Sequence, residues 1–367
     1  MAASPMNKIF LNGRFSVQSL SGVQRFATEI TRALSEIWPP DLPRPELLTP
    51  QTNTTASVSM DLGFPARSCG RFQGQIWEQV DLPKATASGL LVNLGNTAPL
   101  HLSSRHSRQL VVIHDAGVFS TPQSYSRQFR AYYKILHRLL ALGKTRIITV
   151  SKFSRNDIAR HLKIDPARIS VITEGADHAT RIAADRTVLK ANGLESGKYV
   201  LAVGNKAPHK DFAALDHLAA TLSQRGIKLV ISGGMNGRVF SAGTPDLQHA
   251  TYVGRVTDAE LHALYSDAVC FVFPSIYEGF GLPPVEAMEA GCPVVARDIP
   301  VLREVCGQAA LFGRGPSDLT ARVVELLDQP NRANDLRCAG YEQVQKYRWT
   351  IAARQLLDIM REEFIKC

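Results

Sequence analysis

The segment PSIYEGFGLPPVEAMEAGCPVV spans residues 274–295 and places two carboxylates, Glu278 and Glu286, on either side of a glycine- and proline-rich spacer. Gly279 and Gly281 let the backbone turn tightly and bring N–H groups close to a ligand. The two prolines that follow suit the first turn of a helix. We therefore expect a loop that leads into a helix N-terminus, which favours an anion such as a phosphorylated ligand. The alternative is a buried corner whose glutamates only cap the helix.

The same residues carry a family resemblance. Glu-Gly-Phe-Gly-Leu-Pro, followed by Glu-Ala-Met and Gly-x-Pro-Val, resembles the signature of retaining, nucleotide-sugar-dependent glycosyltransferases of the GT-B fold, family 4, or glycosyl transferases group 1. The resemblance implies an α/β fold with two Rossmann-like, doubly wound parallel-sheet domains that face each other across a cleft. The overall sequence, including LVNLGNTAPL and VIHDAGVFSTPQSYS, also resembles bacterial enzymes of surface-polysaccharide and lipopolysaccharide assembly, which often add mannose or rhamnose.

Length and composition agree with a two-domain globular protein. A chain of 367 residues exceeds the size of a single core. The expected parts are residues 1–175, residues 176–348 and a last helix, 349–367, that crosses back to the first domain. No apolar run reaches membrane-spanning length and no signal peptide is recognisable, so the cytoplasm is the expected compartment. The six cysteines lack any Cys-x-x-Cys pair, which predicts thiols without a disulfide framework or zinc site.

The net charge of +9 is concentrated in the N-terminal half. Residues 1–173 hold 21 Lys and Arg against 10 Asp and Glu, and residues 127–163 contain a single acid, Asp157. Such a basic region could dock on an anionic membrane surface, here the inner face of the cytoplasmic membrane. The alternative is an ordinary solvated helix face. Nucleic acid is not expected, because no recognition motif accompanies the charge.

Apolar runs of strand length alternate with helical patterns along both halves, which predicts a parallel sheet in each. In the first half, a strand at 8–14 precedes a helix that opens at Gly22, and the run 110–113 ends at His114. Residues 41–88 are interpreted as irregular, apart from one strand near 47–49. In the second half, strands at 199–204 and 227–232 end in glycine or polar residues, and a strand at 268–274 leads to the Glu-Gly-Phe-Gly corner. Ligands bind at such strand ends in parallel sheets.

The resemblance also implies roles for individual residues. The expected catalytic residues are His114, beside the donor sugar, Lys210, which neutralises the diphosphate, and Glu278, which orients sugar hydroxyls. Glu286 would accept hydrogen bonds from the ribose. The remaining expected nucleotide-sugar contacts come from glycine loops, strand ends and the helix start: Gly22, Gly204, Asn205, Lys206, Arg255, Val256, Gly279, Phe280, Gly281 and Leu282.

The chain departs from the family pattern at two positions. Asn205 stands where many relatives have arginine, and Glu174-Gly175 replaces a common Asn-Gly. Because no Asp-x-Asp occurs, we expect neither a metal nor a cofactor besides the nucleotide-sugar donor. The expected acceptor is a glycan or lipid-linked glycan. Alternatives are a GT-B nucleotide-sugar epimerase and a noncatalytic nucleotide-sugar-binding subunit.

Overall fold

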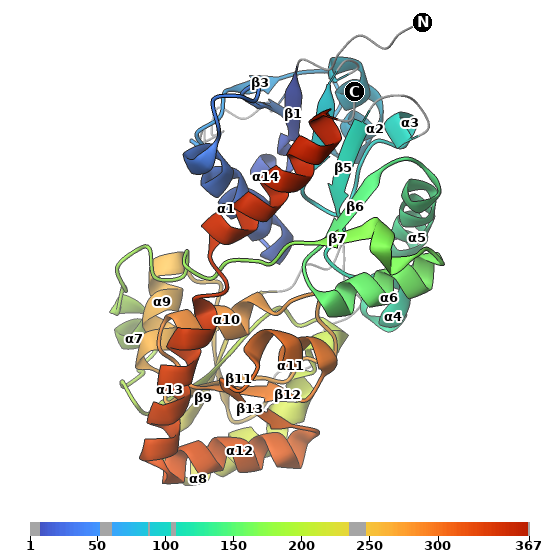
Figure 1. Ribbon diagram of the computed structural model, residues 1–367. Coiled ribbons are helices and arrows are strands. Elements are labelled where there is room, and N and C mark those ends of the chain that lie inside the picture. The colour runs from blue at the N-terminus through green and yellow to red at the C-terminus, as the bar shows by residue number, and fades with distance from the viewer. Residues whose placement is uncertain (1–7, 52–60, 87–88, 104–107, 235–246, 366–367) are drawn as a thin grey trace, which may run out of the picture. The chain divides into compact units, whose positions relative to one another are not determined.

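The computed structural model describes residues 8–51, 61–86, 89–103, 108–234 and 247–365 (Figure 1). The chain divides into two compact units. Unit 1 consists of Met1–Ala116, Ala131–Gly175 and Trp349–Cys367, and unit 2 consists of Gly117–Arg130 and Ala176–Arg348. The segment 117–130, which the sequence analysis places in the first domain, thus clusters with unit 2.

Unit 1 is built on a parallel sheet with the strand order β3-β2-β1-β4-β5-β6-β7. Its strands are β1 (Ile9–Asn12), β2 (Glu46–Thr49), β3 (Ala66–Ser68), β4 (Leu90–Asn93), β5 (Arg108–Val112), β6 (Arg146–Thr149) and β7 (Ile169–Val171). From β1 the chain continues to one side of the sheet, and from β4 to the other. The strand order therefore reverses between β1 and β4, and open α/β sheets bind ligands at such a switch point.

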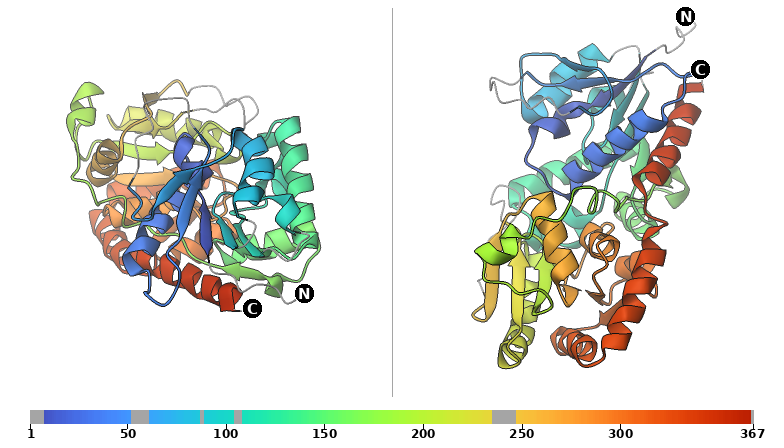
Figure 2. Two further views of the ribbon diagram at one scale, coloured as in Figure 1. Left: turned by 90° about the horizontal axis from the view of Figure 1, so that it is seen from above. Right: turned by 90° about the vertical axis from the view of Figure 1, so that its left-hand side faces the viewer.

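The helices of unit 1 connect these strands. They are α1 (Gly22–Ile37), α2 (Gly74–Ala85), α3 (Leu100–Ser103), α6 (Lys152–Leu162) and α14 (Trp349–Ile365), together with most of α5 (Arg127–Leu142), which begins in unit 2. Short 3-10 turns, η1 (Gly13–Val17) and η3 (Pro166–Arg168), complete the connections. α1 and α14 pack side by side (Figures 1 and 2).

The interpretation of residues 41–88 as irregular is wrong, because this stretch contains β3 and α2. Pro83 lies in the last turn of α2, and the buried positions of this helix mix apolar and acidic side chains. That mixture hides the helical period in the sequence. Trp77 of α2 is fully buried, and its indole N–H donates to the Cys69 carbonyl at 2.7 Å. Burying a side chain of this size stabilises the fold by about 3 kcal/mol.

Unit 2 has a second parallel sheet, in the order β10-β9-β8-β11-β12-β13. Its strands are β8 (Tyr199–Val203), β9 (Lys228–Ser232), β10 (Ala250–Gly254), β11 (Cys270–Phe273), β12 (Val294–Arg297) and β13 (Ala310–Gly313). Here the order reverses between β8 and β11. The predicted doubly wound parallel sheets are confirmed in both units.

Against this second sheet pack α8 (Asp216–Gln224), α10 (Leu282–Glu289) and α12 (Pro316–Asp328). Unit 2 also contains α4 (Gly117–Ser120), α7 (Thr187–Ala191), α9 (Asp258–Asp267), α11 (Pro300–Cys306) and α13 (Pro330–Val344), with 3-10 turns η2 (Pro122–Ser124), η4 (Pro208–Lys210) and η5 (Phe212–Leu215). α9 starts with a capping box between Thr257 and Glu260. The core between β8, β9, β11, α8 and α12 includes Val200, Leu218 and Val323. Cys270 and Cys306 are buried, which raises the pKa of each thiol to about 12.

Candidate active site

The switch point of unit 2 collects most of the residues predicted from the sequence. All strands of this sheet are parallel, so the loops that follow β8, β9, β10 and β11 leave from one edge. The loop after β8 carries Gly204 to Lys210, and the loop after β11 carries Glu278 to Gly281. Because β8 and β11 are neighbours whose connections diverge, these two loops border the crevice in which a ligand is expected.

Lys210 and Glu278 form an ion pair in that position. Lys210 Nζ donates to Glu278 Oε1 at 2.6 Å, and both side chains are nearly buried, with 13% and 12% of their surface exposed. Lys210 Nζ also lies 5.4 Å from the centre of the Phe273 ring. An ammonium group has three donors, and this carboxylate contact uses one of them. The pair therefore presents a fixed positive group together with a carboxylate acceptor.

Backbone contacts and a second ion pair hold the two loops together. The amide of Ile276 donates to the carbonyl of His209 at 2.9 Å. Arg297, at the end of β12, bonds to the Asp211 carboxylate and donates from Nε to the Pro274 carbonyl at 3.1 Å. Burial and the neighbouring Lys210 charge lower the pKa of His209 to about 4. His209 is therefore neutral at physiological pH and adds no positive charge beside Lys210.

Glycines allow the neighbouring strand ends to approach closely. Gly204 has a φ of 156° and its amide donates to the Ser232 carbonyl at 3.0 Å. Gly233 has a φ of 140°, and a Cβ atom there would lie 1.9 Å from the Gly204 carbonyl oxygen. Only glycine fits this position. The Asn205 side chain accepts from the Ala207 amide at 3.1 Å, so it shapes the turn that precedes Lys210.

Two further predicted contacts lie at the same edge of the sheet. Lys206 Nζ is 4.9 Å from the centre of the Tyr252 ring, on β10. Arg255 and Val256 follow β10 directly, and the Arg255 side chain lies over Gly234, at 3.6 Å from where a Cβ atom would stand. The structure thus brings the residues that follow β8 and β10 together with Gly233 and Gly234, which follow β9.

The glycine loop after Glu278 leads directly into α10, as predicted. Gly281 is the N-cap with a φ of 104°, and a Cβ atom there would lie 2.8 Å from the Leu302 side chain. The Phe280 ring is buried and packs edge-on against Tyr347, with ring centres 5.3 Å apart. Phe280 can therefore offer a ligand its backbone amide but not its ring. Leu282 opens the helix and is buried as well.

Glu286 is held by two partners that sequence reasoning missed. Its Oε1 lies 2.9 Å from His178 Nε2, and its Oε2 accepts from the Tyr265 hydroxyl at 3.1 Å. Burial, followed by the Glu286 charge, raises the pKa of Tyr265 well above its ordinary value, so this hydroxyl stays a donor. A carboxylate offers about four acceptor sites, and these two contacts occupy two of them. Nothing in the sequence signals these partners, since His178 is 108 residues away.

Two predicted residues, Gly22 and His114, belong to unit 1. Gly22 is the exposed first residue of the sixteen-residue helix α1, whose N-cap Ser21 makes no side-chain cap bond to the backbone. His114 follows β5 and is buried. Its Nδ1 lies 3.3 Å from Glu174 Oε1 and its Nε2 lies 3.2 Å from the Leu94 carbonyl. The unexpected Glu174 is thus the partner of the predicted histidine.

Within the described residues, no group of three or more His, Cys, Asp or Glu side chains is arranged to hold a metal ion. Among the same residues, no helix combines the length and apolar character that a membrane crossing requires. The prediction that the reaction needs no metal stays a prediction.

The sequence is similar to those of known glycosyltransferases. A family model described as glycosyl transferases group 1 matches residues 185–343. The chain is 30% identical over 274 residues to O-antigen chain mannosyltransferase B of Escherichia coli, covering 70% of this chain and 71% of that protein. It is 30% identical over 233 residues to the O-antigen chain mannosyltransferase RfbU of Salmonella typhimurium, covering 61% and 62% respectively.

A solved structure shares the fold across both units. The structure of WaaG, a glycosyltransferase involved in lipopolysaccharide biosynthesis, aligns with a TM-score of 0.67 over 96% of this chain and 99% of that chain, at 14% sequence identity. At this level of identity the likeness concerns the fold alone.

Proposed function

Because this chain belongs to the glycosyl transferases group 1 family and has the GT-B fold, we propose that it transfers a mannosyl residue from a nucleoside-diphosphate sugar to a hydroxyl of a bacterial O-antigen or related glycan. The main support for placing the donor site in unit 2 is the Lys210–Glu278 ion pair at the switch point of its sheet. Glycosyl transfer is the family's activity, whereas the sugar and the acceptor are our proposal.

Mannose is favoured over rhamnose by the names of the two relatives compared above, which are both mannosyltransferases of O-antigen chains. Neither relative is an epimerase or a noncatalytic subunit. The same names favour a glycan or lipid-linked glycan acceptor.

The chemistry follows from the charge that develops as the sugar leaves. The departing diphosphate gains negative charge, and Lys210, the amides of the glycine loop and the α10 N-terminus are the positive groups at the switch point. Glu278 would accept hydrogen bonds from sugar hydroxyls while it orients Lys210. We propose that transfer retains the anomeric configuration and proceeds without a metal, with the leaving oxygen taking the proton of the acceptor hydroxyl.

Glu286 would bind the ribose of the donor. His178 and Tyr265 fix the carboxylate before any ligand arrives, so little side-chain entropy is lost on binding. A nucleotide that binds only the folded chain increases the free energy of unfolding by about 2.7 kcal/mol at a ligand concentration of 100 Kd. The melting temperature rises as a result.

A thermal-shift panel of GDP-, UDP-, dTDP- and ADP-sugars tests this function. The expected result is a rise with a mannose-containing donor in the wild type that Glu286→Ala loses. Tyr265→Phe serves as the matched variant, because it removes one partner of Glu286 but leaves the carboxylate, and it should keep a reduced shift. A wild type that no nucleotide sugar stabilises, and that releases no nucleotide from any donor, would refute the assignment.

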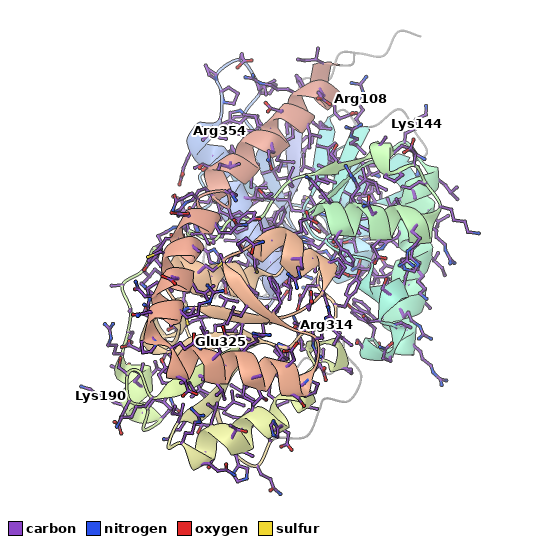
Figure 3. The ribbon with its side chains drawn as sticks, turned by 60° about the horizontal axis from the view of Figure 1, so that its bottom comes forward. Arg108, Lys144, Lys190, Arg314, Glu325 and Arg354 are labelled. Atoms are coloured by element: carbon purple, nitrogen blue, oxygen red, sulfur yellow. The ribbon has the colours of Figure 1, made fainter. Side chains whose placement is uncertain are left out.

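We also propose that unit 1 docks on an anionic membrane surface, where a lipid-linked acceptor would be presented at the inner face of the cytoplasmic membrane. The exposed apolar side chains Ile135, Leu139 and Leu142 recur at four and three residues on α5, so they form one stripe. The exposed Arg138 lies within this stripe, and Lys144 follows its end (Figure 3). Apolar residues beside basic ones suit the interface of an anionic bilayer.

Cosedimentation with vesicles of phosphatidylglycerol and phosphatidylethanolamine tests this docking. The wild type should sediment at low salt and the triple variant Ile135→Ser, Leu139→Ser, Leu142→Ser should not. Ile182→Ser, which changes an equally exposed isoleucine elsewhere, is the control. Equal sedimentation of all three proteins would contradict the docking proposal without affecting the proposed transfer reaction.

A further inference from the structure

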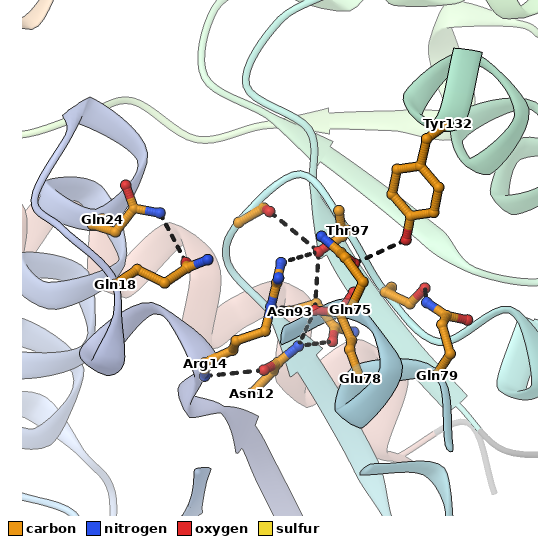
Figure 4. A network of polar contacts seen from close by, with 12 residues as sticks. Asn12, Arg14, Gln18, Gln24, Gln75, Glu78, Gln79, Asn93, Thr97 and Tyr132 are labelled. Atoms are coloured by element: carbon orange, nitrogen blue, oxygen red, sulfur yellow. Dashed lines mark hydrogen bonds and ion pairs between the residues drawn. The ribbon is translucent and has the colours of Figure 1, made fainter. Parts of the chain in front are cut away.

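A network of polar side chains lies at the switch point of unit 1 (Figure 4). Asn12, at the end of β1, donates to Glu78 Oε2 at 3.0 Å and to Asn93 Oδ1, at the end of β4, at 2.9 Å. Arg14 follows β1, and its Nε lies 3.0 Å from Glu78 Oε2. Thr97 donates to the same carboxylate oxygen at 2.9 Å and accepts from Arg14 Nη2 at 2.8 Å.

The network continues outward from this buried base. With the Gln75 amide oriented to satisfy both neighbours, its oxygen accepts from Arg14 Nη1 at 3.0 Å and its nitrogen meets the Tyr132 hydroxyl at 2.8 Å. Arg14 and Glu78 are 8% and 1% exposed, whereas Tyr132 is 36% exposed. The polar groups thus form a column that begins at the sheet and ends at the surface between α2 and α5.

Fold stability alone does not account for this column. A buried arginine–glutamate pair must overcome the desolvation of two charges, and apolar replacements of similar volume are often neutral or stabilising. The pair stands at the reversal of strand order, where α/β sheets bind ligands. Its effect is to hold the Gln75 amide in one orientation, because the carbonyl of Gln75 must face the guanidinium and its amino group must face Tyr132.

The chemistry of the outer end indicates an uncharged, hydroxyl-rich ligand. Arg14 and Glu78 neutralise each other, so the column has no net charge to attract an anion. Burial and the nearby Glu78 charge raise the pKa of Tyr132 to about 12, so its hydroxyl remains a donor at physiological pH. A phenol, a carboxamide and an aromatic ring are groups that bind sugar hydroxyls and pack against the apolar face of a pyranose ring.

We propose that Gln75 and Tyr132 form a subsite for one sugar residue of the acceptor glycan, with Arg14 and Glu78 as positioning residues beneath it. This inference rests on the proposed function and adds which residues of unit 1 recognise the acceptor. The sequence analysis missed the subsite because it missed α2, which carries both Gln75 and Glu78.

Saturation-transfer NMR in the absence of donor tests the subsite directly. The probes are methyl α-D-mannopyranoside and methyl N-acetyl-β-D-glucosaminide. At least one of them should show saturation transfer with the wild type, and Gln75→Ala and Tyr132→Phe should each weaken its binding about five- to tenfold, as expected for one lost hydrogen bond. Changes to Arg14 or Glu78 are avoided, because they would leave a buried charge without its partner.

Two matched variants control for structural damage. Gln79→Ala removes a glutamine one turn along α2 that bonds only to the backbone of Ala98 and Leu100 in the described contacts. Tyr341→Phe removes an exposed phenol of unit 2, away from this network. Both should bind the glycoside as the wild type does. Absence of any glycoside signal with the wild type, or equal binding by Gln75→Ala and Gln79→Ala, overturns the subsite.

The proposed function and the subsite fail in different ways. The thermal shift by a nucleotide sugar should be the same in Gln75→Ala and the wild type, because unit 2 is unchanged. If a nucleotide sugar raises the melting temperature but Gln75→Ala and Tyr132→Phe bind the glycoside as the wild type does, only the subsite is wrong. If the glycoside binds as predicted and no donor shifts the protein, the assigned donor chemistry is wrong and the subsite stands.

Discussion

His114 and Glu174 face each other at 3.3 Å inside unit 1, on residues that follow β5 and β7. The other ring nitrogen of His114 points at the carbonyl of Leu94, which can only accept a hydrogen bond, so Nε2 must carry a proton. Nδ1 faces the Glu174 carboxylate, so the two contacts together fix the orientation of the ring.

Glu174→Gln should lower kcat roughly tenfold, because the substitution keeps the shape of the side chain but removes the charge that faces His114 Nδ1 and helps to fix the ring. Steady-state kinetics should show the loss in kcat and leave the KM for the donor unchanged. Asp157→Asn, a matched change beside His161, is the control and should keep the wild-type kcat. Equal kcat in Glu174→Gln and the wild type would refute a positioning role for Glu174.

Lys210→Ala should lower kcat/KM about 100-fold, as expected when one charged donor to a developing anion is removed. Lys198→Ala provides the comparison, because Lys198 also pairs with a glutamate, Glu195 at 2.7 Å, but both side chains are well exposed. Surface pairs of that kind contribute little. Steady-state kinetics should therefore separate the two variants. Equal rates for Lys210→Ala and Lys198→Ala would remove Lys210 from the site.

Gly233→Ala should destabilise unit 2 by more than about 3 kcal/mol and raise the KM for the donor, because its methyl group would overlap the carbonyl of Gly204. Gly226→Ala is the matched change. Its φ is also positive, at 68°, but a methyl group there has open space, so only about 1 kcal/mol of backbone strain is expected. Melting temperatures measured with and without donor compare the two. A Gly233→Ala protein as stable as Gly226→Ala would show that the strand ends can separate.

Acid should destabilise unit 1 through His137. Burial lowers the pKa of His137 from 6.5 to about 4 in the folded chain, where its Nε2 lies 2.9 Å from the Asn96 carbonyl. Between pH 6.5 and pH 4 the unfolded chain therefore binds a proton at His137 that the folded chain does not. The free energy of unfolding falls over this range by roughly 3 kcal/mol in total.

His137→Gln keeps a hydrogen-bond donor but cannot titrate, so its melting temperature should fall less than that of the wild type between pH 7 and pH 4.5. Parallel acid-melting curves for the two proteins would exclude His137 as a source of the pH dependence. His217→Gln, a change at a less buried histidine in unit 2, is the control and should follow the wild type.

The sequence predicts the site of unit 2 better than that of unit 1, and the reason is local. Lys210, Glu278 and Gly281 lie in short loops directly after apolar strands, so chain order places them at one edge of a parallel sheet. Glu174 also follows a strand, but its pairing with His114 spans 60 residues and leaves no local pattern.

The missed helix α2 shows a second limit. Its inward face carries Glu78 and Asp81 as well as Trp77 and Leu82, because the acids serve a polar network and a loop rather than an apolar core. Asp81 accepts from the amides of Arg71 and Phe72, both at 2.9 Å. A period of apolar residues cannot reveal a helix whose buried face is half charged.

Because α14 belongs to unit 1, its late synthesis affects how this protein folds on the ribosome. Phe26 of α1 packs against Trp349 of α14, with ring centres 5.9 Å apart, and Gly175 approaches the Trp349 backbone so closely that a Cβ atom would lie 2.5 Å from its nitrogen. α14 is translated only after all of unit 2. At about 5–20 residues per second, the nascent first unit therefore waits roughly ten seconds or more with the apolar face of α1 uncovered. During that interval it is a natural substrate for chaperones.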